Sequence, residues 1–109
     1  MADPVAFLQH LIAVQRKGET AVQRAVADAA GGLGCKVEAV RYRPADVPMV
    51  GEFAVRRAMD TGERESVVAT FKGSGGGRSL IFFAHPDGEP VSGLERWSHE
   101  PFSGTIAAG

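Results

Sequence analysis

The chain has 109 residues, of which 44% are hydrophobic and 23% are charged, and its formal net charge is −1. This length and composition predict one modest globular domain. The 12 basic and 13 acidic residues give no electrostatic reason to expect nucleic acid or an acidic membrane surface as a partner. The charges over residues 56–65 mix both signs, which indicates a solvated segment.

The N-terminus does not combine a basic region with a long apolar core, so we expect no secretory signal. No apolar run in the sequence approaches the ~18 residues that span a membrane. Cys35 is the only cysteine, so no disulfide can form within the chain, and we expect it to be a small buried apolar residue. These features together predict a cytoplasmic protein.

Two helices are predicted at the start of the chain. Asp3 suits a helix N-cap, and apolar residues then recur at helical spacing over residues 4–16, up to Gly18. The spacing of valine and alanine predicts a second helix over residues 19–33. Gly34 suits the C-terminal cap of that helix.

Strands are predicted over residues 36–42, 67–71 and 79–84, where β-branched, aromatic and other apolar residues gather. The glycine-rich residues 73–77 predict a hairpin loop between the last two strands. A phosphate-binding loop is the alternative, but such loops lead from a strand into a helix. A short helix over residues 52–59 is the only element that we predict between the first two strands.

A histidine and a carboxylate directly follow the apolar run of residues 80–84. His85 and Asp87 are two positions apart, so in an extended chain their side chains point to the same side. Imidazole is the commonest metal ligand, and a nearby carboxylate can bind metal or hold the imidazole in the required tautomer. The pattern predicts half of a metal site. The alternative is a hydrogen-bonded pair with a structural role alone.

The other candidate side chains carry weaker signals. We expect His10 on the polar face of the first helix, and His99 in a loop without a second ligand. Glu89 is expected to be a solvated loop carboxylate, with a place at the active site as the alternative. Trp97 and Phe102 are expected to pack on the edge of the sheet, with the lining of a substrate pocket as the alternative.

Three stretches of the sequence carry a resemblance to a known family. They are Leu33-Gly34-Cys35-Lys36-Val37-Glu38, His85-Pro86-Asp87-Gly88-Glu89-Pro90-Val91 and Trp97-Ser98-His99-Glu100-Pro101-Phe102-Ser103-Gly104. In this order, and after two predicted helices, they make the chain similar to the N-terminal portion of a family of co-catalytic zinc hydrolases. The family includes aminoacylase, acetylornithine deacetylase, succinyl-diaminopimelate desuccinylase and related carboxypeptidases and dipeptidases. The resemblance covers nearly the whole chain in outline and is specific from residue 79 to residue 109. Glu89 departs from the family pattern, because the family more often has an apolar residue before the proline.

The resemblance implies an α/β fold in which residues 1–109 form the N-terminal part of a three-layer α/β/α catalytic domain, with helices on a mixed or largely antiparallel sheet. It implies a metal-dependent hydrolase that cleaves the amide bond of an N-acyl amino acid or a small peptide. Two zinc ions are expected, with cobalt or manganese as alternatives, and the full-length protein could be a homodimer. His85 would be a metal ligand, and Asp87 the carboxylate of the catalytic site that orients the His85 imidazole.

The chain offers too few ligands for that site. A catalytic zinc needs about three protein ligands and an open water position, and a two-metal site also needs a bridging group. The family's bridging aspartate, its paired glutamates with the general base, its other acidic ligand and its last histidine have no match in this sequence. Residues 105–109 also lack any signal that would end a helix or strand. We therefore expect the 109-residue chain to be incomplete and inactive on its own.

Two other hypotheses follow from the residues alone. The chain could be a truncated, non-catalytic domain or interaction module, because an unpaired sheet edge invites association. It could also be a small metal-binding domain that completes its ligand set between subunits, for which a third good ligand is needed.

Overall fold

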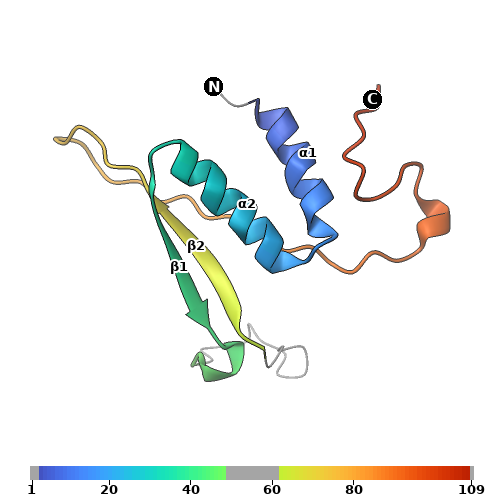
Figure 1. Cartoon of the computed structure of the whole chain (residues 1–109), viewed down its shortest axis with the longest axis horizontal. Helices are drawn as coiled ribbons and strands as arrows, with labels where there is room; N and C mark the ends of the chain where they lie inside the picture. The colour runs from blue at the N-terminus through green and yellow to red at the C-terminus, as the bar shows by residue number, and fades with distance from the viewer. Residues whose placement is uncertain (1–2, 49–61, 109) are drawn as a thin grey trace. The chain divides into compact units, whose positions relative to one another are not determined.

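The computed structural model of the chain describes residues 3–48 and 62–108 (Figure 1). These residues form a small mixed α/β structure with two α helices and a two-stranded antiparallel sheet, which confirms the predicted α/β class. The helix predicted over residues 52–59 lies outside the described residues. The elements are, in chain order, α1 (Pro4–Gln15), α2 (Glu19–Gly32), β1 (Lys36–Tyr42), the 3-10 helix η1 (Pro44–Asp46), β2 (Arg64–Thr70) and the 3-10 helix η2 (Leu94–Arg96).

Helix α1 begins and ends where local signals predict. The Asp3 side chain accepts a hydrogen bond from the backbone N–H of Val5 at 2.9 Å, which satisfies one of the amides that a helix leaves unpaired at its N-terminus. Arg16 is the C-cap, and Gly18 then takes a φ of +90°, a conformation that favours glycine. The predicted helix is thereby confirmed to within one residue.

Helix α2 ends in a Schellman motif. Gly34 takes a φ of +83°, and its N–H donates to the carbonyl of Gly31 at 2.9 Å. The N–H of Cys35 reaches back to the carbonyl of Ala30 at 3.1 Å. These two bonds satisfy carbonyls that the helix end would otherwise leave unpaired, so the predicted glycine cap is confirmed. Cys35 is a free cysteine and is half-buried rather than fully buried as predicted.

Strands β1 and β2 pair antiparallel, with Ala39 opposite Val67. The predicted strand over residues 36–42 is confirmed, and the second strand begins earlier than predicted. Arg41 lies opposite Glu65, and its Nε is 3.1 Å from Glu65 Oε2. This cross-strand ion pair helps to define the register because opposite charges at facing positions stabilise a sheet.

The predicted strand over residues 79–84 is wrong. All of these residues are described, and they form neither helix nor strand. The side chains of residues 80–83 are between 80% and 90% exposed. A run with apolar residues on both of its faces forms a stable strand only when other elements bury both faces. The described residues do not bury residues 80–83 on either face. The predicted hairpin is therefore also wrong: β2 pairs with β1, and residues 73–77 lead into an unpaired segment.

The chain divides into two compact units, Met1–Val26 with Gly73–Gly109 and Ala27–Lys72, and the boundary lies within α2. The sheet belongs to the second unit. The first unit contains α1, the N-terminal half of α2 and the irregular segment after the glycine-rich loop, which includes His85 and Asp87. The candidate site therefore lies within the first unit.

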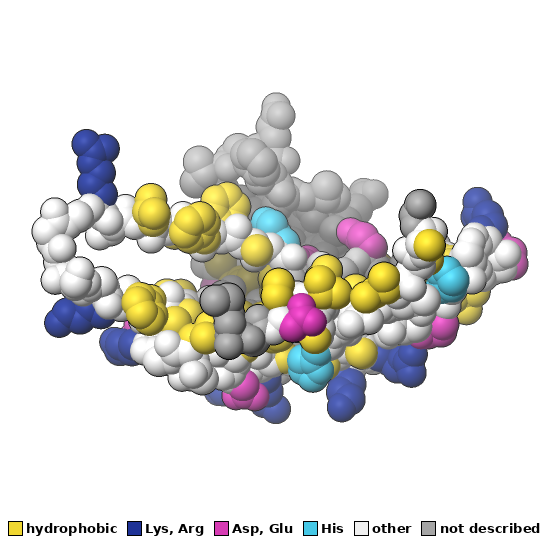
Figure 2. Space-filling view, turned by 90° about the horizontal axis from the view of Figure 1, so that it is seen from above, with side chains coloured by type: hydrophobic (Ala, Val, Ile, Leu, Met, Phe, Trp, Pro, Cys, Tyr) yellow, Lys and Arg dark blue, Asp and Glu magenta, His cyan; other side chains and the backbone are white. Residues whose placement is uncertain are grey.

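The described residues bury very little apolar surface. Val22 is 1% exposed and is their only fully buried apolar side chain, and Gln23 is buried beside it in sequence. Figure 2 shows many apolar side chains open to solvent on the face turned to the viewer. No helix among the described residues is long and apolar enough to cross a membrane. The exposed large apolar side chains are Val5, Leu8, Leu33, Val40, Val47, Val68, Phe71, Leu80, Ile81, Phe82, Phe83, Leu94, Trp97 and Ile106.

Candidate functional site

His85 and Asp87 face one another, as their spacing predicts. The Nδ1 atom of His85 lies 3.8 Å from Oδ1 of Asp87, and the two side chains are 85% and 51% exposed. This distance is longer than a hydrogen bond, so the two groups face each other without forming one. Because the carboxylate stands beside Nδ1, Nε2 is the ring nitrogen that a metal ion would approach.

The backbone between these two residues is held by the last residue of α1. The Nε2 amide of Gln15 donates a hydrogen bond to the carbonyl oxygen of Pro86. The same side chain also lies against Gly88, where a Cβ atom would be only 3.4 Å from Oε1 of Gln15. Gln15 therefore contacts the backbone on both sides of Asp87.

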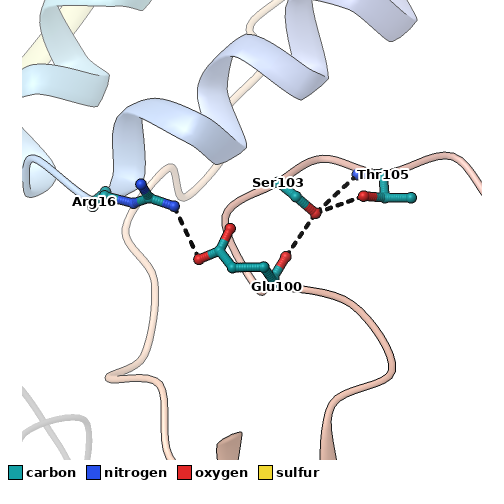
Figure 3. A network of polar contacts seen from close by, with 4 residues as sticks. All are labelled: Arg16, Glu100, Ser103 and Thr105. Carbon is teal, nitrogen blue, oxygen red and sulfur yellow. Dashed lines mark hydrogen bonds and ion pairs between the residues drawn. The ribbon is translucent and has the colours of Figure 1, made fainter.

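Arg16, which follows Gln15, contacts a second part of the irregular segment (Figure 3). Its Nη2 atom lies 2.9 Å from Oε1 of Glu100, and its guanidinium carbon is 5.6 Å from the centre of the Phe102 ring. The Ser103 hydroxyl donates to the carbonyl of Glu100 at 2.7 Å and shares a 2.7 Å hydrogen bond with the hydroxyl of Thr105. The Arg16 and Glu100 side chains are more than half exposed, so their ion pair orients the segment at a gain of no more than about 1 kcal/mol.

A third residue of α1 holds the segment near Gly104. The Nε2 amide of Gln9 donates to the Gly104 carbonyl at 2.7 Å. Gly104 has a φ of +60°, and a Cβ atom there would lie 3.2 Å from Cα of Gln9, so the backbone approaches the helix closely. Gln9 and Arg16 are seven positions apart and share a helical face. This face contacts the segment near Glu100 and Gly104, while Gln15 contacts it near Pro86.

The remaining candidates lie apart from the pair. His10, Glu89 and His99 are exposed, as predicted. Trp97 donates from its indole nitrogen to the carbonyl of Ser92 at 3.2 Å, within its own loop. Phe102 is half-buried beside Arg16. Both of these contacts lie within the first unit, so the predicted packing of the two aromatic residues on the edge of the sheet stays a prediction.

The donor types of the pair suit a zinc ion, because imidazole nitrogen and carboxylate oxygen are both zinc ligands. Among residues 3–48 and 62–108, however, no group of three or more histidine, cysteine, aspartate or glutamate side chains is placed to hold a metal ion. These residues thus contain the two side chains that the sequence predicts and not a complete ligand set.

No protein-family model matches this chain, and no solved structure matches it significantly. The similarity to co-catalytic zinc hydrolases therefore stays a prediction from the residue patterns. Sequence reasoning missed the contribution of Gln15 and Arg16. Their positions near a helix end carry no signal of the distant segment that they contact, since the Pro86 carbonyl lies 71 positions away from Gln15.

Proposed function

We propose that this chain supplies His85 and Asp87 to a metal-dependent hydrolase of amide bonds, as the N-terminal part of a three-layer α/β/α domain of the aminoacylase type. The observation that carries the proposal is the alignment of His85 Nδ1 with the Asp87 carboxylate at 3.8 Å, on an imidazole that is 85% exposed. An accessible imidazole with a carboxylate beside one nitrogen has the arrangement of a metal ligand and its orienting partner.

In this proposal His85 binds metal through Nε2, and Asp87 holds the proton on Nδ1. The tautomer matters because only the nitrogen without a proton can donate its lone pair to a metal. Divalent metal ions in such a site polarise the substrate carbonyl and lower the pKa of a bound water. The substrate would be an N-acyl amino acid or a small peptide. The general base is not among the residues of this chain that match the family.

The small core is a second observation that supports an incomplete domain. Val22 is the one fully buried apolar side chain in the described part of the chain, while residues 80–83 expose nearly all of their apolar surface. In a three-layer domain, a run that is apolar on both faces would be a central strand covered by helices. The exposure of residues 80–83 is what such a strand would show without its neighbours.

The test uses the protein as its gene encodes it. His85→Ala should abolish hydrolysis of N-acetyl amino acids and short peptides and should lower the amount of bound zinc. Asp87→Asn should reduce metal affinity or activity by about 10-fold to 100-fold, the range for residues that orient a ligand. His10→Ala and His99→Ala are the controls and should keep both properties. Wild-type hydrolysis and metal content in His85→Ala would refute the assignment.

The exposed apolar run favours a second candidate, a non-catalytic interaction module. Residues 80–83 are apolar, highly exposed and without a strand partner among the described residues, and such segments associate readily. Sedimentation velocity of the 109-residue chain separates the candidates. Concentration-dependent association that is unchanged by added zinc or by a metal chelator favours the interaction module. Association that requires zinc favours a metal site completed between subunits.

A further inference from the structure

We infer that Gln15 is a positioning residue for the His85–Asp87 pair. The inference rests on the proposed roles of these two residues. It adds a third residue, Gln15, whose role no sequence pattern indicates. Gln15 is the last residue of α1. Its side-chain amide donates a hydrogen bond to the carbonyl of Pro86, the residue between His85 and Asp87 in the sequence. Its hydrogen bond is to the backbone, so it acts on the pair through the backbone.

The geometry of the peptide bond explains how this contact reaches Asp87. The carbonyl of Pro86 and the N–H of Asp87 belong to one planar peptide unit. A donor that fixes the direction of the carbonyl therefore also fixes the direction of the bond from nitrogen to Cα of Asp87. The proline ring restricts φ on the other side of the same carbonyl. The Cα atom of Asp87, from which its side chain starts, is thereby positioned from a rigid helix.

Gly88 extends the contact past Asp87. A Cβ atom at this position would lie 3.4 Å from Oε1 and 3.6 Å from Cδ of Gln15, so the glutamine amide lies directly against the backbone there. The hydrogen bond to Pro86 and the packing on Gly88 bracket Asp87 on both sides.

The pair needs such support because its own contact is weak. His85 and Asp87 are exposed, lie outside helices and strands, and are separated by 3.8 Å. Closing this distance to a hydrogen bond of about 2.8 Å requires a shift of only about 1 Å. A backbone that moves freely would spread the two side chains over many arrangements and lose that alignment.

The experiment measures the tautomer of His85 in the 109-residue chain from the ¹⁵N shifts of its ring nitrogens, in alkaline buffer where neutral imidazole predominates. In the wild-type background, Asp87→Asn should change the ratio of the two tautomers by about fivefold, the equilibrium equivalent of one ordinary hydrogen bond. In a Gln15→Met background, the same Asp87→Asn substitution should change the logarithm of the tautomer ratio by less than half as much.

Gln9→Met is the matched control. It also removes a glutamine of α1 that donates to a backbone carbonyl, but that carbonyl belongs to Gly104, so the effect of Asp87→Asn should persist. The rings of His10 and His99 serve as internal references and should not respond. Circular dichroism should show that each variant keeps its helices.

Gly88→Val is a second route to the same test, because a Cβ there would already be in van der Waals contact with Oε1 of Gln15 at 3.4 Å, and the γ-methyl groups of valine would crowd the Gln15 amide without changing α1. It should reduce the effect of Asp87→Asn as Gln15→Met does. An undiminished Asp87→Asn effect in both backgrounds overturns the inference. So does an Asp87→Asn substitution that leaves the His85 tautomer unchanged in the otherwise wild-type chain.

The protein as its gene encodes it separates this inference from the proposed function. Loss of tautomer coupling in Gln15→Met, with wild-type hydrolysis and zinc content in His85→Ala of that protein, supports the positioning role and contradicts the metal-ligand role. Loss of hydrolysis and zinc in His85→Ala, with coupling unchanged in Gln15→Met, contradicts the positioning role and supports the metal-ligand role.

Discussion

The side-chain amide of Gln15 donates a hydrogen bond to the carbonyl of Pro86, and it thereby connects the last residue of α1 to the centre of the His85–Asp87 pair. The two partners are 71 positions apart in the sequence. A rigid helix end is a suitable support for an irregular segment, because side chains on regular elements are held more precisely than those on loops. The candidate site is therefore a property of α1 as well as of the segment that carries its ligands.

Gly34→Ala should destabilise the chain by about 1–2 kcal/mol, because Gly34 takes a φ of +83° that costs other residues about this much. Gly31→Ala is the matched control. It lies inside α2 with no atom within 4 Å of a new Cβ, so it should stabilise the helix by up to about 1 kcal/mol. Urea unfolding followed by circular dichroism measures both. Equal effects of the two substitutions would contradict the Schellman motif.

Asp3→Ala should remove the cap of α1 and cost about 1 kcal/mol of helix stability, since the N–H of Val5 loses its partner. Amide hydrogen exchange in the first turn of α1 should speed up, while exchange in β1 and β2 should not change. Asp3→Asn is the control, because asparagine caps helices as well as aspartate does. Fast exchange in Asp3→Asn as well would show that charge, rather than the cap, stabilises this turn.

Glu100→Gln should lower stability by less than about 1 kcal/mol, and the loss should shrink as salt is added. The reason is the exposure of the pair, since the Arg16 and Glu100 side chains are 63% and 52% exposed. Thermal unfolding of Glu100→Gln and of the control Glu89→Gln, which changes an exposed loop carboxylate, at low and high salt gives the comparison. A loss of several kcal/mol that salt does not alter would mean that Arg16 and Glu100 are buried when the protein folds.

Phe82→Lys should reduce concentration-dependent association of the chain without changing its circular dichroism. The Phe82 side chain is 89% exposed within an uncharged apolar run, and a charge placed there opposes association between such runs. Ser74→Lys adds the same charge outside the run and is the control. Loss of helix and strand signal in Phe82→Lys, but not in Ser74→Lys, would show that the run is packed in the folded chain.

Features that depend on neighbours along the chain were predicted well. The N-cap at Asp3 and the glycine cap at Gly34 each act within about five positions, so the sequence around them contains both partners. The facing arrangement of His85 and Asp87 is local in the same sense, because the two residues are only two positions apart. These features needed no knowledge of the tertiary structure.

The strand predicted over residues 79–84 shows where local reasoning failed. An apolar, aromatic run has a strong preference for extended backbone, and the segment is irregular all the same. A strand exists only through hydrogen bonds to another strand, so its formation depends on which segment lies beside it. In this chain β2 pairs with β1 along its whole length, and the apolar run has no strand partner among the described residues.

The sequence by itself thus determined the two helices, the caps at Asp3 and Gly34 and the facing arrangement of His85 and Asp87, because all of these are decided by contacts between near neighbours. Only the tertiary structure decided the partner of β2, the exposure of residues 80–83 and the place of Gln15 beside Pro86. Each of these depends on segments that are far apart in the sequence. The free energy that brings such segments together comes from packing and burial, which no short pattern of residues encodes.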